Sequence, residues 1–447
     1  MAGIAGIASK NAEAEVEEML NTIRHRGKES ISIFEKNGTT LGLVWNESED
    51  EIVEKLLADG NVGDNNGSGH YAWVKPENGN FKMYRDELGV APLYHGKDQT
   101  GNICFASEVK ALQEITEDIS EIPPGHTFEG GNLKLYFKLE TGTPLKDNPE
   151  QIAVLLHDLL DGAVSNCISS EPIGSWLSGG LDSSTICALA ARHVKQLKTF
   201  AAGLKGAPDL EFARETADFI KSDHYEVIVT LEDMIRVLPD VIYHLESFDA
   251  LLVRSSVTNY LVAKLASEHV SEVFSGEGGD ELFAGYDYLK SMPPEQLGKE
   301  LIKITGSLHN TALQRVDRSA SAHGTRAHVV FANPEVVRFA LTIPVKYKIF
   351  NNQEKWILRK AMEGLLPDSI LQRPKAKFWE GAGVKNVLSD YASKKISDRD
   401  FRTERIMSNG LNINTKEELF YYRIFKDHFG SYHNLKWMGR TKGSPIE

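Results

Sequence analysis

Seven consecutive residues, SGGLDSS from Ser178 to Ser184, combine two glycines with hydroxyl and carboxylate side chains. They precede a segment of helical character, so free backbone N–H groups at a helix N-terminus would face whatever the loop binds. Gly179 and Gly180 allow a close backbone approach, and the loop contains no lysine, which excludes the GxxxxGK[ST] phosphate loop. Asp182 would repel a phosphate unless a cation bridged them, so the pattern predicts an anion held together with Mg²⁺.

A second group of acidic residues lies in the stretch VFSGEGGDELFAGYDYLK, which begins at Val273. This stretch is typical of a short apolar strand that ends in a turn, and the turn would present Glu277, Asp280 and Glu281 together. Clustered carboxylates often belong only to a solvated turn, so this motif indicates a functional site only in combination with SGGLDSS.

Both motifs need elements that hold them, and the chain shows two kinds of pattern. Before about residue 145, short alternating segments separated by Gly, Asn and Asp predict an antiparallel sheet with few helices. After about residue 150, helical segments alternate with short apolar strands, which predicts a parallel, doubly wound sheet. SGGLDSS then follows the first strand of that sheet. From about Ser291 onward the pattern is almost wholly helical.

The composition narrows the class of protein. A chain of 447 residues with 41% hydrophobic residues can build two or three domain cores. Fifty basic against 63 acidic side chains give a net charge of -13, which argues against a nucleic-acid partner. No apolar run approaches the roughly 18 residues of a membrane span, and no signal-like segment opens the chain. We therefore expect a soluble, cytoplasmic protein whose three cysteines are buried, reduced thiols.

SGGLDSS resembles the pyrophosphate-binding loop SGGxDSS of the ATP pyrophosphatases, which split ATP into AMP and pyrophosphate while they adenylate an acceptor. The second motif is similar to the second active-site segment of asparagine synthetases, and the similarity covers nearly the whole chain. It implies that residues 150–447 form an α/β parallel-sheet domain of the ATP pyrophosphatase (adenine nucleotide alpha hydrolase-like) type, with a helical C-terminal part. Residues 1–145 would form an α+β domain of the N-terminal-nucleophile (Ntn-type, αββα) glutaminase kind.

The resemblance also implies roles for individual residues. Asp182 and Asp280 would bind Mg²⁺ and clamp the leaving pyrophosphate, and Glu277 would take a proton from the attacking amine. Arg254 matches the family arginine near the acyl-adenylate, and Lys375 matches a lysine that stabilises the charge developing during the reaction. The residues expected to contact ATP are Leu177, Ser178, Gly179, Gly180, Asp182, Ser183, Ser184, Gly203, Ser275 and Gly276.

The N-terminal part departs from the family pattern. Position 2 is Ala2, where glutamine-using members carry the nucleophilic cysteine, and Lys28 stands in place of a proline. The NGEIYN-like segment that supplies oxyanion donors is missing, because LGLVW runs almost directly into EDEIVEKLLADG. We therefore expect a truncated, inactive glutaminase-like domain. In addition, Leu251 and Leu252 replace two threonines ahead of Arg254, which puts aspartate in doubt as the substrate.

The sequence is compatible with three functions. The first is an asparagine synthetase-like ligase that adenylates aspartate or another small carboxylate and forms an amide with ammonia or an amine, without glutamine hydrolysis. The second is a biosynthetic ligase or cyclase that joins a larger or intramolecular amine, like the enzymes that form β-lactams or lasso peptides; Glu277 opposes the β-lactam case, because those relatives place a tyrosine there. The third is a non-catalytic regulatory paralogue. We expect ATP and Mg²⁺ as cofactors, neither nucleic acid nor membrane as a partner, and leave a homodimer open.

Overall fold

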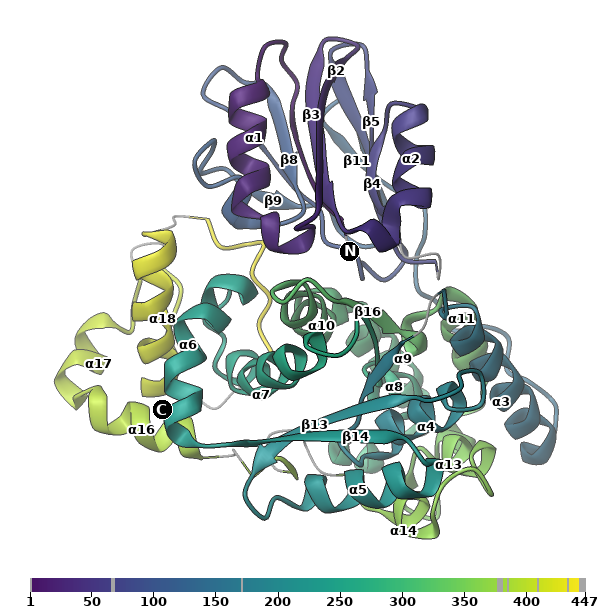
Figure 1. The fold of residues 1–447 in the computed structure, drawn as a ribbon. Coiled ribbons are helices and arrows are strands. Elements are labelled where there is room, and N and C mark those ends of the chain that lie inside the picture. Colours follow the sequence, from purple (N-terminus) through teal and green to yellow (C-terminus); the bar gives the residue numbers. More distant parts are fainter. Residues whose placement is uncertain are drawn as a thin grey trace.

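The protein has two parts, antiparallel sheets built from the N-terminal residues and a parallel sheet surrounded by helices (Figure 1). The structure is a computed structural model that describes residues 2–65, 69–169, 172–375, 381–383, 386–407, 410–431 and 434–441. Among these residues, no helix is both long and apolar enough to cross a membrane.

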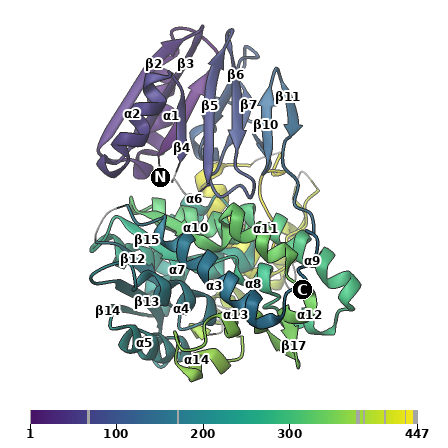
Figure 2. The same ribbon diagram turned by 90° about the vertical axis from the view of Figure 1, so that its right-hand side faces the viewer.

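Two antiparallel sheets form the N-terminal part, and Figure 2 shows them beside each other above the helices. Their strand orders are β2-β3-β1-β8-β7-β9 and β11-β10-β6-β5-β4. Apolar side chains from both sheets, among them Leu41, Phe105 and Met83, share one buried core. The strands are β1 (Gly3–Ile7), β2 (Ser30–Lys36), β3 (Thr39–Trp45), β4 (Val62–Asn65), β5 (Tyr71–Glu77), β6 (Asn80–Arg85), β7 (Tyr94–Lys97), β8 (Ile103–Ala106), β9 (Ser120–Glu121), β10 (His126–Glu129) and β11 (Asn132–Leu135).

Helices are few in this part, as the alternating sequence pattern predicted. Helix α1 (Glu13–Thr22) packs against β1 and β3 through Val16, Met19 and Leu20. Helix α2 (Asp50–Ala58) follows β3 after a short turn, so the chain does pass almost directly from LGLVW into a helix. The Ntn-type assignment and a domain boundary near residue 145 stay predictions.

A parallel sheet with the strand order β14-β13-β12-β15-β16 forms the centre of the second part. All of its neighbouring strands pair in parallel, as predicted. Strand order reverses beside β12, because β13 lies on one side of it and β15 on the other. Loops that leave a doubly wound sheet at such a point diverge and leave a crevice for a ligand. The strands are β12 (Gly174–Trp176), β13 (Lys198–Leu204), β14 (Asp223–Val229), β15 (Glu272–Ser275) and β16 (Arg326–Val329).

Helices cover this sheet and dominate the C-terminal region. The chain after Ser291 is less uniformly helical than predicted, because β16 joins the sheet edge and a small hairpin forms from β17 (Ile349–Phe350) and β18 (Gln353–Glu354). β17 and β18 are too short to produce a periodic signal, and Arg326 and His328 interrupt the apolar run of β16. The helices are α3 (Pro149–Ser165), α4 (Leu181–Ala190), α5 (Pro208–Ile220), α6 (Leu231–Leu245), α7 (Ala250–Ser267), α8 (Gly279–Phe283), α9 (Pro294–Gly306), α10 (Ala312–Ser321), α11 (Pro334–Thr342), α12 (Val345–Lys348), α13 (Trp356–Ala361), α14 (Asp368–Gln372), α16 (Val387–Lys395), α17 (Asp398–Glu404) and α18 (Lys416–Phe429).

Buried ion pairs join the two parts. The guanidinium of Arg26 donates to Asp317 of α10 at 2.9 Å and 3.0 Å, and to Glu108 at 2.8 Å. Arg318 extends the network to Glu246 at 3.0 Å. Burial opposes the charge on Arg26, but the nearby carboxylates of Asp317 and Glu108 raise its pKa.

Candidate active site

The SGGLDSS loop connects β12 to α4 and is shaped by close backbone contacts. Gly179 has φ +68°, and a Cβ there would lie 2.5 Å from the backbone nitrogen of Ala213, so only glycine fits against α5. The hydroxyl of Ser183 accepts a hydrogen bond from the Ser178 backbone at 3.2 Å and donates to the Gly180 carbonyl at 3.1 Å. These bonds hold the loop so that the first N–H groups of α4 face the pocket.

The second motif lies directly against this loop. A Cβ on Gly276 would lie 2.6 Å from the Ser183 nitrogen, and one on Gly279 would lie 2.5 Å from Cγ of Asp182. The glycines after β15 therefore allow the two loops at the switch point to touch. This contact brings Asp182 and Asp280 together, as the combination of the two sequence motifs required.

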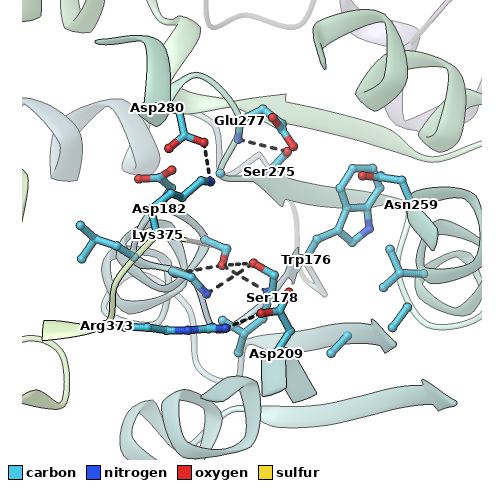
Figure 3. Close-up of a pocket in the computed structure, with 18 of the residues that line it drawn as sticks. Trp176, Ser178, Asp182, Asp209, Asn259, Ser275, Glu277, Asp280, Arg373 and Lys375 are labelled. Carbon is cyan, nitrogen blue, oxygen red and sulfur yellow. Dashed lines mark hydrogen bonds and ion pairs between the residues drawn. The ribbon is translucent and has the colours of Figure 1, made fainter. Parts of the chain in front are cut away.

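Two lysines neutralise the two aspartates (Figure 3 shows Lys375 with both carboxylates). Nζ of Lys355 lies 2.5 Å from Asp182 Oδ2 and 2.5 Å from Asp280 Oδ1, and Nζ of Lys375 lies 2.5 Å from Asp280 Oδ2. Burial would raise the pKa of Asp280, but the two ammonium groups outweigh it and lower that pKa. Burial, together with the neighbouring charge of Asp280, raises the pKa of Asp182.

The donor set at this point fits a magnesium ion that arrives with a phosphate ligand. Oδ1 of Asp182 is buried and accepts no hydrogen bond from the described residues. Mg²⁺ is commonly held by one or two carboxylates together with substrate phosphates, and Asp182 and Asp280 supply two. Within the described part of the chain, no group of three or more His, Cys, Asp or Glu residues could hold a metal.

Glu277 lines the same pocket from the turn after β15, and its side chain is 29% exposed. It forms an ion pair with Arg315 of α10, whose other terminal nitrogen donates to the Ser255 hydroxyl at 2.8 Å. The carboxylate is therefore oriented by a cation that is itself anchored on α7. Such an arrangement can receive a proton from a group bound in the pocket.

Most residues predicted for the site do line one pocket. Four do not. Arg254 pairs with Glu417 of α18, and the Ser184 hydroxyl lies 3.2 Å from the Thr216 hydroxyl. Gly179 packs on α5, and Gly203 packs on Leu210. Leu251 and Leu252 also lie outside the lining. The predicted residues that line the pocket are Leu177, Ser178, Gly180, Asp182, Ser183, Ser275, Gly276, Glu277, Asp280 and Lys375.

Several lining residues were not predicted from the sequence. Lys355 immediately precedes α13 and reaches the aspartates from far along the chain. Arg373 pairs with Asp209 at 2.5 Å and lies over the ring of Phe212 at 4.0 Å. Asn259 lines the pocket from α7. Of these residues, Arg373 could have been expected near the site from the sequence, because it stands two residues before the predicted Lys375.

The site lies at the switch point of a parallel sheet, in an α/β protein whose glycine-rich loop joins β12 to α4. The model of the asparagine synthase family matches residues 155–304 and 293–442, and that of the glutamine amidotransferase domain matches 47–137. The chain belongs to the asparagine synthase family.

Two relatives illustrate the match. The chain is 34% identical over 374 residues to "Asparagine synthetase [glutamine-hydrolyzing] 2" of Arabidopsis thaliana, covering 78% of this chain and 65% of that protein. It is 34% identical to "Asparagine synthetase B [glutamine-hydrolyzing]" of Escherichia coli (strain K12), covering 80% and 69%. The chain thus spans about two thirds of the length of these relatives. Among solved structures, NMN synthetase from Francisella tularensis is 13% identical with a TM-score of 0.30, covering 67% of this chain and 100% of that one.

Proposed function

We propose that the protein is an ATP-dependent, AMP-forming ligase that makes an amide bond. A substrate carboxylate attacks the α-phosphorus of ATP, pyrophosphate leaves, and ammonia or an amine then attacks the resulting acyl-adenylate. The products are the amide, AMP and one proton. The observation that supports this proposal most directly is the convergence of Asp182 and Asp280 with two lysines beside the N-terminus of α4.

The residues of the pocket divide the two half-reactions between them. Lys355 and Lys375 would stabilise the negative charge that accumulates on the pyrophosphate as it leaves. Asp182 and Asp280 would hold Mg²⁺, which neutralises phosphate charge when it is bound. Glu277, held by Arg315, would accept the proton released when the amine attacks. The loop of Ser178 and Gly180 would bind the pyrophosphate through backbone N–H groups.

The proposed nitrogen source is ammonia or an amine, without glutamine hydrolysis. Ala2 carries no thiol, and its side chain is buried at 2% exposure. Arg26, close by, is already bound by Asp317 and Glu108. The methyl group of Ala2 is not a nucleophile. The guanidinium of Arg26 already donates to two carboxylates, so it is not available to bind glutamine.

The proposed acid is small and is aspartate or another carboxylate. Arg254 is held by Glu417, and Leu251 and Leu252, which stand in place of two threonines, are buried outside the pocket lining. This turn of α7 therefore directs neither a hydroxyl from these positions nor the guanidinium of Arg254 at the pocket. It thus supplies no group that would select aspartate over another carboxylate.

Exchange of labelled pyrophosphate into ATP, measured with a panel of carboxylic acids, tests the adenylation step. We expect exchange to require one class of acid, and no exchange with any acid would reject the ligase function. Amide formation is then measured with ammonium or with glutamine at equal nitrogen concentration. Glutamate released in proportion to AMP would contradict the proposed nitrogen source.

A further inference from the structure

The two ends of the pocket differ in chemistry. Asp182, Asp280 and the two lysines gather at one end, and the lining also includes Trp176, its strand neighbour Phe200, and the apolar residues Ala201, Ala202 and Val262. Figure 3 shows Asn259 on the same side of the pocket as Trp176, away from Asp182 and Asp280. A nucleotide whose phosphates occupy the charged end would therefore place its base against an aromatic and apolar wall.

Asn259 is the polar side chain in this wall. It belongs to α7 and is 5% exposed, and among the described residues nothing accepts a hydrogen bond from its Nδ2. The indole Nε1 of Trp176, a residue that is 7% exposed, also lacks a partner in the described part of the chain. Buried donors without partners are rare, because each loses its hydrogen bonds to water. Two such donors at one end of a pocket point to a ligand that supplies acceptors.

We propose that Asn259 recognises the adenine base, which makes it a specificity-determining residue for the nucleotide. Its amide nitrogen donates to a ring nitrogen of adenine, and its amide oxygen accepts from the exocyclic amine. The match is chemical, since an amide presents one donor and one acceptor side by side, as asparagine does when it reads adenine in nucleic acids. This inference rests on the proposed function, because it assumes that the charged end binds the phosphates.

The test compares two nucleotides that differ only in the recognised group. Binding of ATP and of purine riboside 5′-triphosphate, which lacks the exocyclic amine, is measured by calorimetry on the full chain with Mg²⁺ and no acid. A site built around that amine should prefer ATP by at least about 10-fold. Equal affinity of the unaltered protein for both nucleotides would overturn the proposal without any variant.

A substitution then assigns the preference to this residue. Asn259→Leu keeps a similar volume and removes the amide, so the two affinities should converge to within about 2-fold. Thr258→Val is the matched control: Thr258 is the preceding residue on α7, is buried with an unpartnered hydroxyl among the described residues, and does not line the pocket. It should keep the preference for ATP. An unchanged preference in Asn259→Leu would show that another group reads the base.

The outcome separates this inference from the proposed function. If this end of the pocket received the acyl group instead, Asn259→Leu would change the preferred acid in the exchange assay and leave the nucleotide preference intact. Base-selective binding without exchange for any acid would reject the ligase reaction and retain the role of Asn259.

Discussion

The buried lysine between the two aspartates gives a prediction that does not depend on knowing the substrate. Lys355 is 3% exposed and contacts both Asp182 and Asp280, which are 13% and 16% exposed. In Lys355→Met, two neighbouring carboxylates would share one remaining ammonium, that of Lys375. Removing one partner from a buried ion pair costs about 3–5 kcal/mol, so we expect a loss of that size near neutral pH.

The loss should depend on pH with a definite sign. Without the charge of Lys355, repulsion raises the pKa of the aspartate pair in the folded state above its unfolded value. The folded variant then binds more protons than the unfolded chain, so its stability decreases as the pH rises. We therefore expect the difference from the unaltered protein to be larger at pH 8 than at pH 5. Mg²⁺ should recover more stability in the variant than in the unaltered protein, because it replaces the missing cation.

Urea unfolding midpoints at the two pH values, with and without Mg²⁺, measure these effects. Lys360→Met is the matched control, because Lys360 lies on α13, the helix that Lys355 immediately precedes, and forms a 3.4 Å ion pair with Glu150, which is 65% exposed. Such surface pairs contribute at most about 1 kcal/mol. A cost of Lys355→Met no larger than that of the control, or a cost that is the same at both pH values, would contradict the role assigned to Lys355.

Three further predictions concern the site, the connection between the two parts, and the pH dependence of stability. Glu277→Gln should keep pyrophosphate exchange but lower amide formation by about 10²–10⁴-fold, the usual effect of losing a general base; equal loss of both activities would assign Glu277 to adenylation or folding. Asp317→Asn should cost about 3–5 kcal/mol in urea unfolding, since it breaks the buried pair with Arg26, whereas Asp161→Asn, at a partly exposed pair with His193, should cost under about 1 kcal/mol. Burial raises the pKa of Glu418 from 4.5 to about 7, so the folded state keeps a proton that the unfolded chain releases, and stability should fall as the pH rises between these values. Glu418→Gln should remove that part of the slope, and an unchanged slope in urea midpoints would contradict the assignment.

The sequence was sufficient for the local features of the site. SGGLDSS predicted a strand, a loop and a helix, and β12 and α4 flank it as expected. Local patterns can reveal such features because the glycines, the serines and the helix N-terminus act within a few residues of one another. The parallel sheet was predicted for the same reason, since each helix and each strand carries its own periodicity.

Contacts from segments that carry no recognisable motif were beyond sequence reasoning. Lys355 reaches Asp182 across 173 positions, and Arg315 reaches Glu277 across 38. Both cations lie in segments whose patterns indicate only ordinary helices. Asn259 was missed because a polar residue inside an apolar helix gives no sign of which cavity it faces. The strand β16 was missed because Arg326 and His328 interrupt the apolar run that revealed the equally short β15.

The position of Glu277 follows from two adjacent residues of α7. Arg254 donates from Nε to Glu417 of α18 at 3.1 Å, and the next residue, Ser255, accepts from Arg315 at 2.8 Å. Arg315 in turn holds Glu277. Because residues 254 and 255 belong to one turn of a helix, the carboxylate in the pocket is connected to α18 through two ion pairs, of which the Arg254–Glu417 pair is buried. Arg254, predicted to contact the acyl group, thus lies in a position from which it fixes the helix that orients Glu277.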